Sequence, residues 1–381
     1  MTAPTVAAIT AALAQVEDPE IHRPITELGM VGAVEIGLRG TNDVAVTILL
    51  TVSGCPLRER IETDVTAAVA TVPGTGPVEV RFGVMSDEAR KDLNARLRGG
   101  TAEREVPFAK PGSLTRVYAV ASGKGGVGKS SVTVNLAAAM AASGLRVGVV
   151  DADIYGHSVP RMLGVEGRPT QVEQMIMPPS AHGVSVISVA MFTQGNTPVV
   201  WRGPMLHRAL QQFLADVYWG DLDVLLLDLP PGTGDIAISV AQLVPTAELL
   251  IVTTPQTAAA EVAERAGSIA QQTHQRIVGV VENMSGFPCP HCGGIVDVFG
   301  SGGGAAVSAS LSRLTGTDVP LLGQIPLDVR LREGGDDGRP LVLTDPESPA
   351  AMVLRKIAET IGGRPRGLAG QSLGISPVSR V

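Results

Sequence analysis

The chain has 381 residues, of which 44% are apolar and only 3% aromatic, so two or three domains with cores of Ala, Val, Leu and Ile are expected. A net charge of −7 at pH 7 argues against the basic surface of a nucleic-acid-binding protein, and no apolar run is long enough to span a bilayer. Three cysteines are too few for a disulfide framework, and residues 1–20 predict an amphipathic helix rather than a signal peptide. We therefore expect a soluble cytoplasmic protein that binds neither nucleic acid nor a membrane.

Residues 1–95 are predicted to form a small α+β domain. Apolar side chains at Val44, Val46, Ile48 and Leu50 keep the period of two that is typical of a half-buried strand. The expected elements are a helix over 6–16, two strands within 31–51 joined by a turn at 40–43, a helix over 55–72 and a strand over 76–84. Residues 96–115 mix charge, Gly and Pro without periodicity and are interpreted as a linker.

Residues 116–362 alternate between apolar strands and helical stretches. Strands are expected over 116–122, 146–153, 183–190, 223–230, 248–255, 276–284 and 319–326. Helices are expected over 129–144, 204–218, 257–273 and 349–361. This alternation predicts an α/β domain with a mostly parallel sheet that is covered by helices on both faces. The tail, residues 363–381, is predicted to be disordered.

A glycine-rich segment follows the first strand of this domain. Gly123, Gly128, Lys129 and Ser130 fit the pattern G-x-x-x-x-G-K-[ST] of a P-loop, with a strand before it and a helix after it. Such a loop binds phosphates with backbone N–H groups and a helix N-terminus, while the lysine reaches the β- and γ-phosphates and the hydroxyl binds Mg²⁺. The residues expected to surround the phosphates of ATP are Gly123, Gly125, Gly126, Val127, Gly128, Lys129, Ser130 and Ser131.

A second lysine, Lys124, lies just inside the loop. With it, the segment resembles the deviant P-loop, K-G-G-x-G-K-[ST], of the MinD, ParA and nitrogenase iron protein group. In that group the extra lysine reaches across a dimer to the partner's nucleotide. The resemblance therefore implies a homodimer in which Lys124 serves catalysis, and a lysine that is merely solvated is the alternative.

Carboxylates at strand ends are predicted to complete the phosphate site. Asp228 ends a strand beside the P-loop, which is the place of a Walker B acid that holds Mg²⁺. Gly232 and Gly234 follow in a turn suited to sensing the γ-phosphate. Asp153 is the candidate for orienting the attacking water, and Asp151 either belongs to the same ion shell or caps the turn. Phosphoryl transfer needs mainly positioning and charge neutralisation, so no covalent nucleophile is expected.

Two later segments are candidates for contact with the base of the nucleotide. Asn283 stands at the end of a late strand, where an asparagine reads the base edge in the same ATPase group. A strand-end cap is the alternative for Asn283. The turn 324–328, which contains Pro326, resembles the second base-side loop of that group.

Cys289 and Cys292 form a C-x-x-C. Thiol–disulfide oxidoreductases place this motif at the start of a helix, but Gly293 and Gly294 follow here and make a poor first turn. A glycine-rich metal knuckle fits better, yet zinc wants four ligands and a [4Fe–4S] cluster wants four cysteines. Since no second C-x-x-C is present, the simplest way to complete the four ligands is to pair two protomers across a two-fold axis. Zinc and iron both remain open as the metal, because both bind thiolates.

The third cysteine, Cys55, precedes a predicted helix near Arg58 and Arg60. Helix N-terminus and cations favour a thiolate there. A transient metal or partner contact and a buried small residue are both open for Cys55.

Taken together, these segments look like the Mrp/ApbC group of iron–sulfur cluster carrier ATPases over roughly residues 113–362, and residues 1–95 resemble the SufT-like small domain that often precedes them. The segments that carry the resemblance are 122–137, 150–164, 201–206, 228–235, 282–293 and 325–342, with 16–31 and 50–61 in the small domain. The resemblance implies a [4Fe–4S] cluster bound at the dimer's C-x-x-C pair, taken from a donor and delivered to apo-proteins under the control of ATP. His157 stands where this group usually has proline.

Two other functions compete with cluster carriage. A MinD/ParA-like positioning ATPase would need a basic amphipathic helix or patch, and residues 351–367 are too weakly basic for it. A P-loop NTPase with a structural zinc site uses the same thiolates and is not separated from a cluster carrier by sequence.

Overall fold

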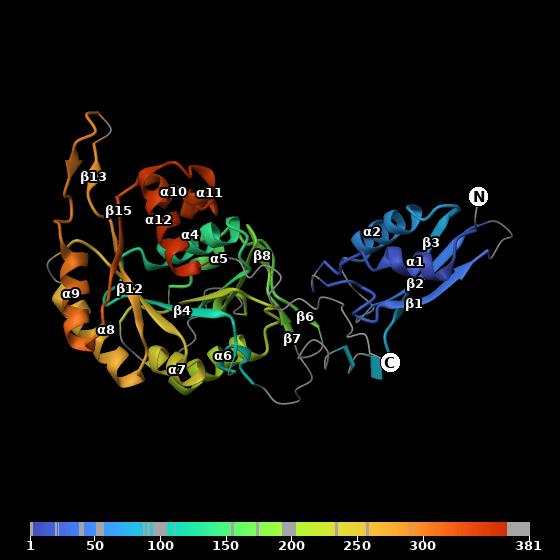
Figure 1. Cartoon of the computed structure of the whole chain (residues 1–381), viewed down its shortest axis with the longest axis horizontal. Helices are drawn as coiled ribbons and strands as arrows, with labels where there is room; N and C mark the ends of the chain where they lie inside the picture. Colours follow the sequence, from blue (N-terminus) through green and yellow to red (C-terminus); the bar gives the residue numbers. More distant parts are fainter. Residues whose placement is uncertain are drawn as a thin grey trace, which may run out of the picture. The chain divides into compact units, whose positions relative to one another are not determined.

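The computed structural model describes residues 3–363 except positions 20, 22, 38–41, 51–56, 87, 90–91, 94–104, 111, 154–155, 173–174, 193–202, 233–234, 257–258 and 290 (Figure 1). Contacts between chain segments divide it into two compact units. Unit 1 comprises Met1–Glu105, Thr170–Met177 and Asp216–Gly220, and unit 2 comprises Val106–Pro169, Pro178–Ala215 and Asp221–Val381.

The described part of unit 1 contains a three-stranded sheet that packs with helices. Its elements are α1 (Val6–Leu13), β1 (Val31–Ile36), β2 (Val44–Leu50), α2 (Arg58–Ala70) and β3 (Val78–Val84). β2 is the central strand, antiparallel to β1 and parallel to β3. Ile61, Val65 and Val69 follow the helical period of four on α2 and are buried, so one face of that helix enters the core. The predicted small domain with three strands is confirmed.

Unit 1 also takes in chain from the middle of the sequence. The hairpin of β6 (Thr170–Val172) and β7 (Met175–Met177) belongs to it, and Val172 and Met177 join its apolar core. The backbone of Ile176 bonds to that of Asp216 and Tyr218, at 2.8 Å in each case. Unit 1 is therefore assembled from three chain segments.

Unit 2 is built on an eight-stranded sheet of order β15-β12-β11-β4-β10-β5-β9-β8, and only the edge strand β8 is antiparallel to its neighbour. Its strands are β4 (Arg116–Ala121), β5 (Val147–Asp151), β8 (Ser180–Ala181), β9 (Val184–Ser188), β10 (Val224–Asp228), β11 (Glu248–Thr253), β12 (Ile277–Asn283) and β15 (Leu321–Ile325). The seven predicted strands are all present. Central strands such as β10 are buried throughout because helices cover both faces, which explains their continuous apolar runs.

Helices lie on both sides of this sheet, as predicted (Figure 1). On one side are α4 (Lys129–Ala142), α5 (Val159–Met162), α10 (Val329–Asp337), α11 (Leu341–Thr344) and α12 (Pro349–Gly362). On the other are α6 (Gly203–Ala215), α7 (Asp235–Leu243), α8 (Ala259–Thr273) and α9 (Gly303–Thr315). The described residues of this unit also form two short 3₁₀ turns, η1 (Pro107–Ala109) and η2 (Val189–Met191). Small residues of α4 such as Ala137 and Ala138 let it pack closely on both the sheet and α12.

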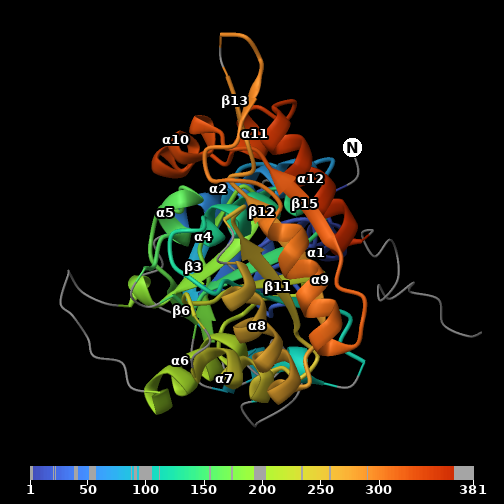
Figure 2. The ribbon, with the colours of Figure 1, turned by 90° about the vertical axis from the view of Figure 1, so that its left-hand side faces the viewer.

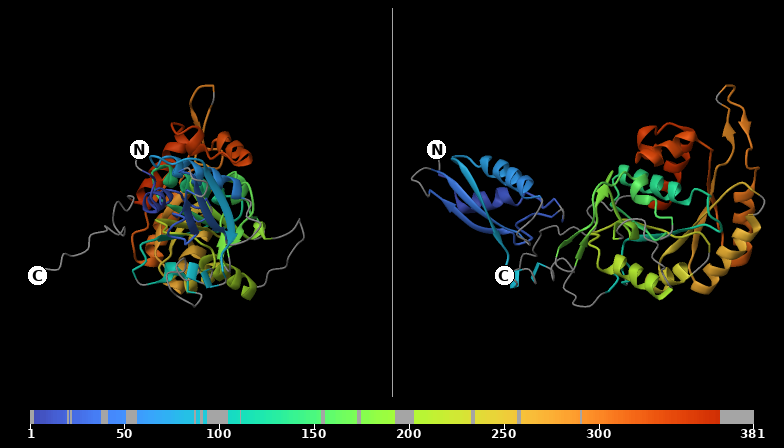
Figure 3. Two further views of the ribbon diagram at one scale, coloured as in Figure 1. Left: turned by 90° about the vertical axis from the view of Figure 1, so that its right-hand side faces the viewer. Right: turned by 180° about the vertical axis from the view of Figure 1, so that it is seen from behind.

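A two-stranded hairpin extends β12 beyond the sheet. Its strands are β13 (Phe287–Pro288) and β14 (Ile295–Val296), paired through Phe287 with Val296 and Pro288 with Ile295. Figures 2 and 3 show this orange hairpin standing out from the rest of unit 2. The C-x-x-C segment thus lies at the tip of a projecting hairpin.

Some predictions fall wholly or partly outside the described residues. They concern Cys55, half of the turn at 40–43, half of the linker 96–115, Gly234 and nearly all of the tail 363–381. Among the helices that are described, none is long and apolar enough to cross a membrane.

Candidate nucleotide site and thiol hairpin

The P-loop connects β4 to α4 and leaves the start of that helix open. Gly128 is the N-cap of α4, has a φ of 78°, and supplies no side chain to cap the first turn. A Cβ on Gly128 would clash with the amide nitrogen of Asn283. Glycine is therefore required, and the first N–H groups of α4 remain available to an anion.

Lys129, Ser130 and Asp228 meet at the open end of α4. The Nζ of Lys129 lies 2.7 Å from Oδ2 of Asp228, and the hydroxyl of Ser130 donates to the same oxygen at 2.6 Å. Asp228 is fully buried and Lys129 is 6% exposed. A hydroxyl beside a carboxylate is a donor set of hard oxygens, which fits Mg²⁺ that also binds phosphate oxygens.

Asp151 lies beside Asp228, because β5 and β10 pair these two residues in register. Its carboxylate accepts the backbone N–H of Asp153 at 3.2 Å, that of Val159 at 3.3 Å and the hydroxyl of Ser188 at 3.2 Å. Burial and, second, the charge of Asp228 raise the pKa of Asp151 to about 7. These contacts favour the turn-capping role for Asp151.

Asp153 follows in the same turn and is buried. Its carboxylate accepts the N–H of Gly156 at 3.0 Å. A Cβ at position 156 would lie 3.0 Å from Oδ2 of Asp153, so glycine allows this close approach. His157 next to it is exposed.

Lys124 contacts its own protomer, since its Nζ bonds to the side-chain oxygen of Gln256. Gly123 beside it accepts a hydrogen bond from Arg265 at 3.3 Å. The next turn is joined to the loop as well, because the N–H of Gly232 donates to the carbonyl of Ser122 at 2.9 Å. Gln256 had no place in the sequence prediction, since it lies more than a hundred positions from the P-loop.

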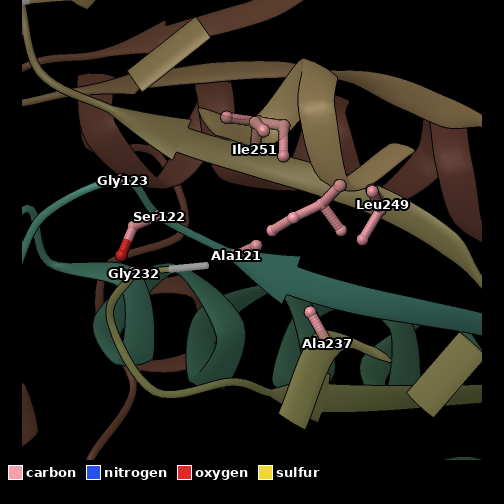
Figure 4. Close-up of a pocket in the computed structure, with 9 residues that line it drawn as sticks. Ala121, Ser122, Gly123, Gly232, Ala237, Leu249 and Ile251 are labelled. Carbon is pink, nitrogen blue, oxygen red and sulfur yellow. The ribbon is translucent and has the colours of Figure 1, made fainter. Parts of the chain in front are cut away.

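A small pocket lies behind the start of the P-loop (Figure 4). It encloses about 300 Å³, open solvent included, and is lined by residues 121–123, Gly232, Ala237 and the side chains of Leu249 and Ile251, among others. The lining is almost wholly apolar. Such a pocket does not suit phosphate, so the open end of α4 remains the candidate phosphate site.

Asn283 connects the P-loop to the base-side segments. It is 6% exposed and its amide donates to the carbonyl of Val127 at 2.9 Å. Ser285 and Gly286 lead from β12 into the hairpin of β13 and β14, and we call them the stalk of this thiol hairpin. Two backbone hydrogen bonds of 2.8 Å join the stalk to the turn that contains Pro326. The N–H of Ser285 donates to the carbonyl of Ile325, and the N–H of Leu327 donates to the carbonyl of Gly286. The predicted base-side residues and the C-x-x-C stalk are therefore one hydrogen-bonded structure.

Cys289 and Cys292 are both free thiols, the first half-buried and the second exposed. The backbone closes the tip through bonds from Cys289 to Gly294 and from Gly293 to Cys289, both 2.8 Å. Gly293 has a φ of 72°, which a side chain disfavours. Backbone N–H groups of His291 and then Cys292, together with the Cys292 thiol, lower the pKa of Cys289. This turn therefore favours a thiolate, as a metal-binding knuckle does.

The hairpin supplies two thiols and little else to a metal. Within the part of the chain that the structure describes, no group of three or more His, Cys, Asp or Glu side chains is arranged to hold a metal ion. Ile295, Val296 and Val298 beside the thiols are more than half exposed.

Two buried side chains at these sites were missed by the sequence analysis. Thr133 donates to Oδ1 of Asp228 at 2.7 Å. Glu282, at the end of β12, accepts from Ser285, Gln324 and Gly304. A signal existed only for Thr133, because it stands one helical turn after Lys129 and so shares its face of α4.

Comparisons with known proteins bear on the family of this chain. A family described as "NUBPL iron-transfer P-loop NTPase" matches residues 113–362, and one described as "Iron-sulfur cluster assembly protein" matches residues 6–82. An iron–sulfur cluster carrier protein of Mycobacterium bovis is 67% identical over 374 residues, covering 98% of this chain and 97% of the relative. Another, of Deinococcus radiodurans, is 46% identical over 360 residues, covering 94% and 95%.

A solved structure is similar as well. It is a nucleotide-binding protein of Archaeoglobus fulgidus in complex with ADP, 36% identical, with a TM-score of 0.52 over 61% of this chain and 89% of that one. The resemblance to the Mrp/ApbC group is thereby confirmed. Because both domains match and relatives align over nearly the whole length, the chain belongs to the family of iron–sulfur cluster carrier proteins with an ATP-binding P-loop NTPase domain.

Proposed function

We propose that this protein is an ATP-dependent carrier that binds a [4Fe–4S] cluster between two protomers and transfers it to apo-proteins. The observation that carries the proposal is the thiol pair of half-buried Cys289 and exposed Cys292, on a hairpin whose stalk is hydrogen-bonded to the predicted base-side turn of the nucleotide site. Relatives named iron–sulfur cluster carrier proteins support it. Cytoplasmic location belongs to the same proposal. So does the division into domains 1–95 and 116–362 around a linker, apart from residues 170–177 and 216–220, which contacts group with unit 1.

For the nucleotide, each residue has a role that follows from its chemistry. Lys129 neutralises the β- and γ-phosphates, and the N–H groups of residues 123–131 bind their oxygens. Ser130 and Asp228 would hold Mg²⁺, which supplies charge neutralisation on the phosphates. Asp153 orients the attacking water. Lys124 would have to leave Gln256 to reach the nucleotide of a second protomer.

For the base, Asn283 and Pro326 line one side of the site. Asn283 already holds the P-loop through the carbonyl of Val127, so an adenine that contacts it is sensed by the phosphate loop. The same strand end continues into the thiol hairpin. We therefore expect a bound adenine to influence both the loop that binds phosphate and the hairpin that would bind the cluster.

The cluster is the cargo of this protein. One protomer offers two thiols at the hairpin tip, whereas a [4Fe–4S] cluster takes about four. Two hairpins brought together by a two-fold axis supply the complete set, and the exposed position of the tip lets an apo-protein reach the cluster. The N–H groups around Cys289, which lower its pKa, would also stabilise cluster-bound sulfur.

A structural zinc site is the second candidate, because the glycine-rich knuckle with two thiolates also suits zinc. Cluster carriage is favoured, since the hairpin projects from unit 2 and a structural zinc usually holds together the fold around it. A positioning ATPase would have no use for this thiol pair.

The test is anaerobic reconstitution followed by iron, sulfide and zinc assay with visible absorbance. Wild type is expected to hold about four irons per dimer. Cys289→Ala and Cys292→Ala should each lose most of the iron but still bind ADP. Lys129→Ala should keep the iron, lose ATP turnover and transfer the cluster poorly, while Asp153→Ala should bind ATP without turnover.

Three results would contradict the proposal. They are full iron loading in both cysteine variants, a stable cluster on a monomer, and zinc in place of iron after anaerobic purification. Normal ATP turnover by Lys129→Ala would refute the nucleotide assignment alone.

A further inference from the structure

Thr133 is a buried residue that contacts the Walker B acid from inside the protein. It lies on α4 one turn after Lys129 and has no exposed surface. Its hydroxyl is 2.7 Å from Oδ1 of Asp228 and 3.0 Å from the carbonyl of Lys129. Oδ2, the other oxygen of Asp228, faces Ser130 and the ammonium of Lys129.

A threonine hydroxyl has one proton and can donate it to only one acceptor at a time. The carboxylate is the stronger acceptor and the nearer one, because hydrogen bonds to an ionised oxygen are shorter and stronger than those to a carbonyl. The carbonyl of Lys129 is, moreover, the normal acceptor of an N–H within α4. The proton of Thr133 is therefore directed at Asp228.

The three donors on Asp228 differ in what a nucleotide does to them. Lys129 and Ser130 are the groups expected to turn toward phosphate and Mg²⁺ when these bind. Thr133 has no exposed surface and cannot reach a ligand. It is thus the donor that stays on Asp228 throughout, and it fixes the carboxylate with Oδ2 toward the metal side.

We infer that Thr133 is a positioning residue for Asp228, which it holds in the orientation needed for Mg²⁺-supported nucleotide binding. The inference rests on the proposed function of Lys129, Ser130 and Asp228. It adds Thr133 to these three residues, and the hydroxyl of Thr133 affects nucleotide binding only by orienting Asp228. Without the hydroxyl, Asp228 would lose its donor on Oδ1 and could rotate away from the metal.

The test measures ADP affinity by calorimetry for the full chain, once with Mg²⁺ and once after removal of Mg²⁺ with EDTA. The ratio of the two affinities reports how well the site uses the metal. In Thr133→Val, which keeps the shape and loses the donor, this ratio should fall roughly tenfold, the effect of losing one charge-assisted hydrogen bond. Affinity in EDTA should stay close to that of wild type.

Two variants separate positioning from damage to the helix. Thr133→Ser keeps the hydroxyl and should restore the wild-type ratio. Asn135→Ala removes a buried side chain of the same helix that bonds to Ser131 and Val342. It should lower stability but leave the Mg²⁺ ratio unchanged. If Thr133→Val does not fold, Thr133→Ala removes the same donor without adding bulk and is expected to show the same fall.

The outcomes are distinguishable. A wild-type ratio in the hydroxyl-free variant overturns the inference, and so does an equal fall in Thr133→Ser. If wild type itself binds no ADP, or binds it without regard to Mg²⁺, the proposed nucleotide function fails first and the inference fails with it.

Discussion

Asp151 and Asp228 are paired on neighbouring strands, so two buried carboxylates share one edge of the sheet. Burial, with the charge of Asp228, raises the pKa of Asp151 to about 7 from an ordinary value of 3.8. Between these values the folded protein binds a proton that the unfolded chain releases. The stability that this proton on Asp151 gives to the folded state is present in full below about pH 4 and is lost as pH rises to about 7.

The variant Asp151→Asn removes this titration while keeping the shape of the side chain. Its free energy of unfolding relative to that of wild type is expected to be higher at about pH 8 than at about pH 5, so the variant is relatively more stable at about pH 8, because only wild type has to ionise a buried acid. Urea unfolding at both pH values measures the difference. Identical pH dependence of stability in the two proteins would show that Asp151 does not titrate in this range.

At this scale, the sequence was informative where the chemistry lies in consecutive residues. The P-loop could be predicted because its glycines, lysine and serine have fixed spacing. The contact of Thr133 with Asp228 could not, because 95 positions separate the two residues and the spacing from Lys129 indicates only which face of the helix Thr133 shares. The role of Asp151 stayed open for the same reason, since its partner Ser188 lies on another strand.

At the scale of elements, Glu282 joins the thiol hairpin to the sheet and to α9. It is fully buried at the end of β12. Its carboxylate accepts the hydroxyl of Ser285 at 2.7 Å, the amide of Gln324 at 2.8 Å and the backbone N–H of Gly304 at 2.5 Å. A charge at this depth is tolerated because donors from the hairpin stalk, β15 and the first turn of α9 surround it.

Replacing Glu282 by Ala would leave these three donors without their acceptor. We expect a loss of about 2–4 kcal/mol in the free energy of unfolding, together with faster alkylation of Cys292, because the stalk of the hairpin is no longer held. Glu248→Ala is the control, since it breaks an exposed pair with Arg276 that is worth about 0–1 kcal/mol. Equal losses in the two variants, or an unchanged alkylation rate, would contradict a holding role for Glu282.

Sequence periodicity found the long elements of the sheet and missed the short ones. The strands of the thiol hairpin have two residues each and those of the hairpin β6–β7 have three, too few to display a period of two. Their formation depends on pairing and turn geometry. The metal-binding type of turn at the two cysteines could be predicted only from Gly293 and Gly294. The projection of the thiol hairpin from unit 2 could not be predicted from the sequence at all.

At the scale of the whole chain, the two units do not follow the sequence order. The predicted domain boundaries place residues 170–177 inside the ATPase domain, whereas the contacts group them with Met1–Glu105. Val172 and Met177 are 4% and 3% exposed within the core of unit 1. Such an arrangement leaves no signal in local sequence, because each side chain looks like an ordinary core residue of either domain.

A fragment of residues 106–381 tests this division. It retains the P-loop, Asp228 and Asn283, so its affinity for ADP is expected to equal that of the full chain. The hairpin β6–β7 would however lose its apolar partners from residues 1–105, and light scattering should detect self-association of the fragment. Substituting Val172 and Met177 by Ser should make the fragment monodisperse.

The same double substitution has the opposite effect in the full chain, where both side chains are buried. There it should lower the free energy of unfolding by roughly 3 kcal/mol or more, since two apolar side chains leave the core. Substituting Leu114 and Met352, which are 61% and 49% exposed, provides the matched control and should change neither property. A monodisperse fragment without any substitution, or a full-length double variant as stable as wild type, would mean that the hairpin does not belong to the core of unit 1.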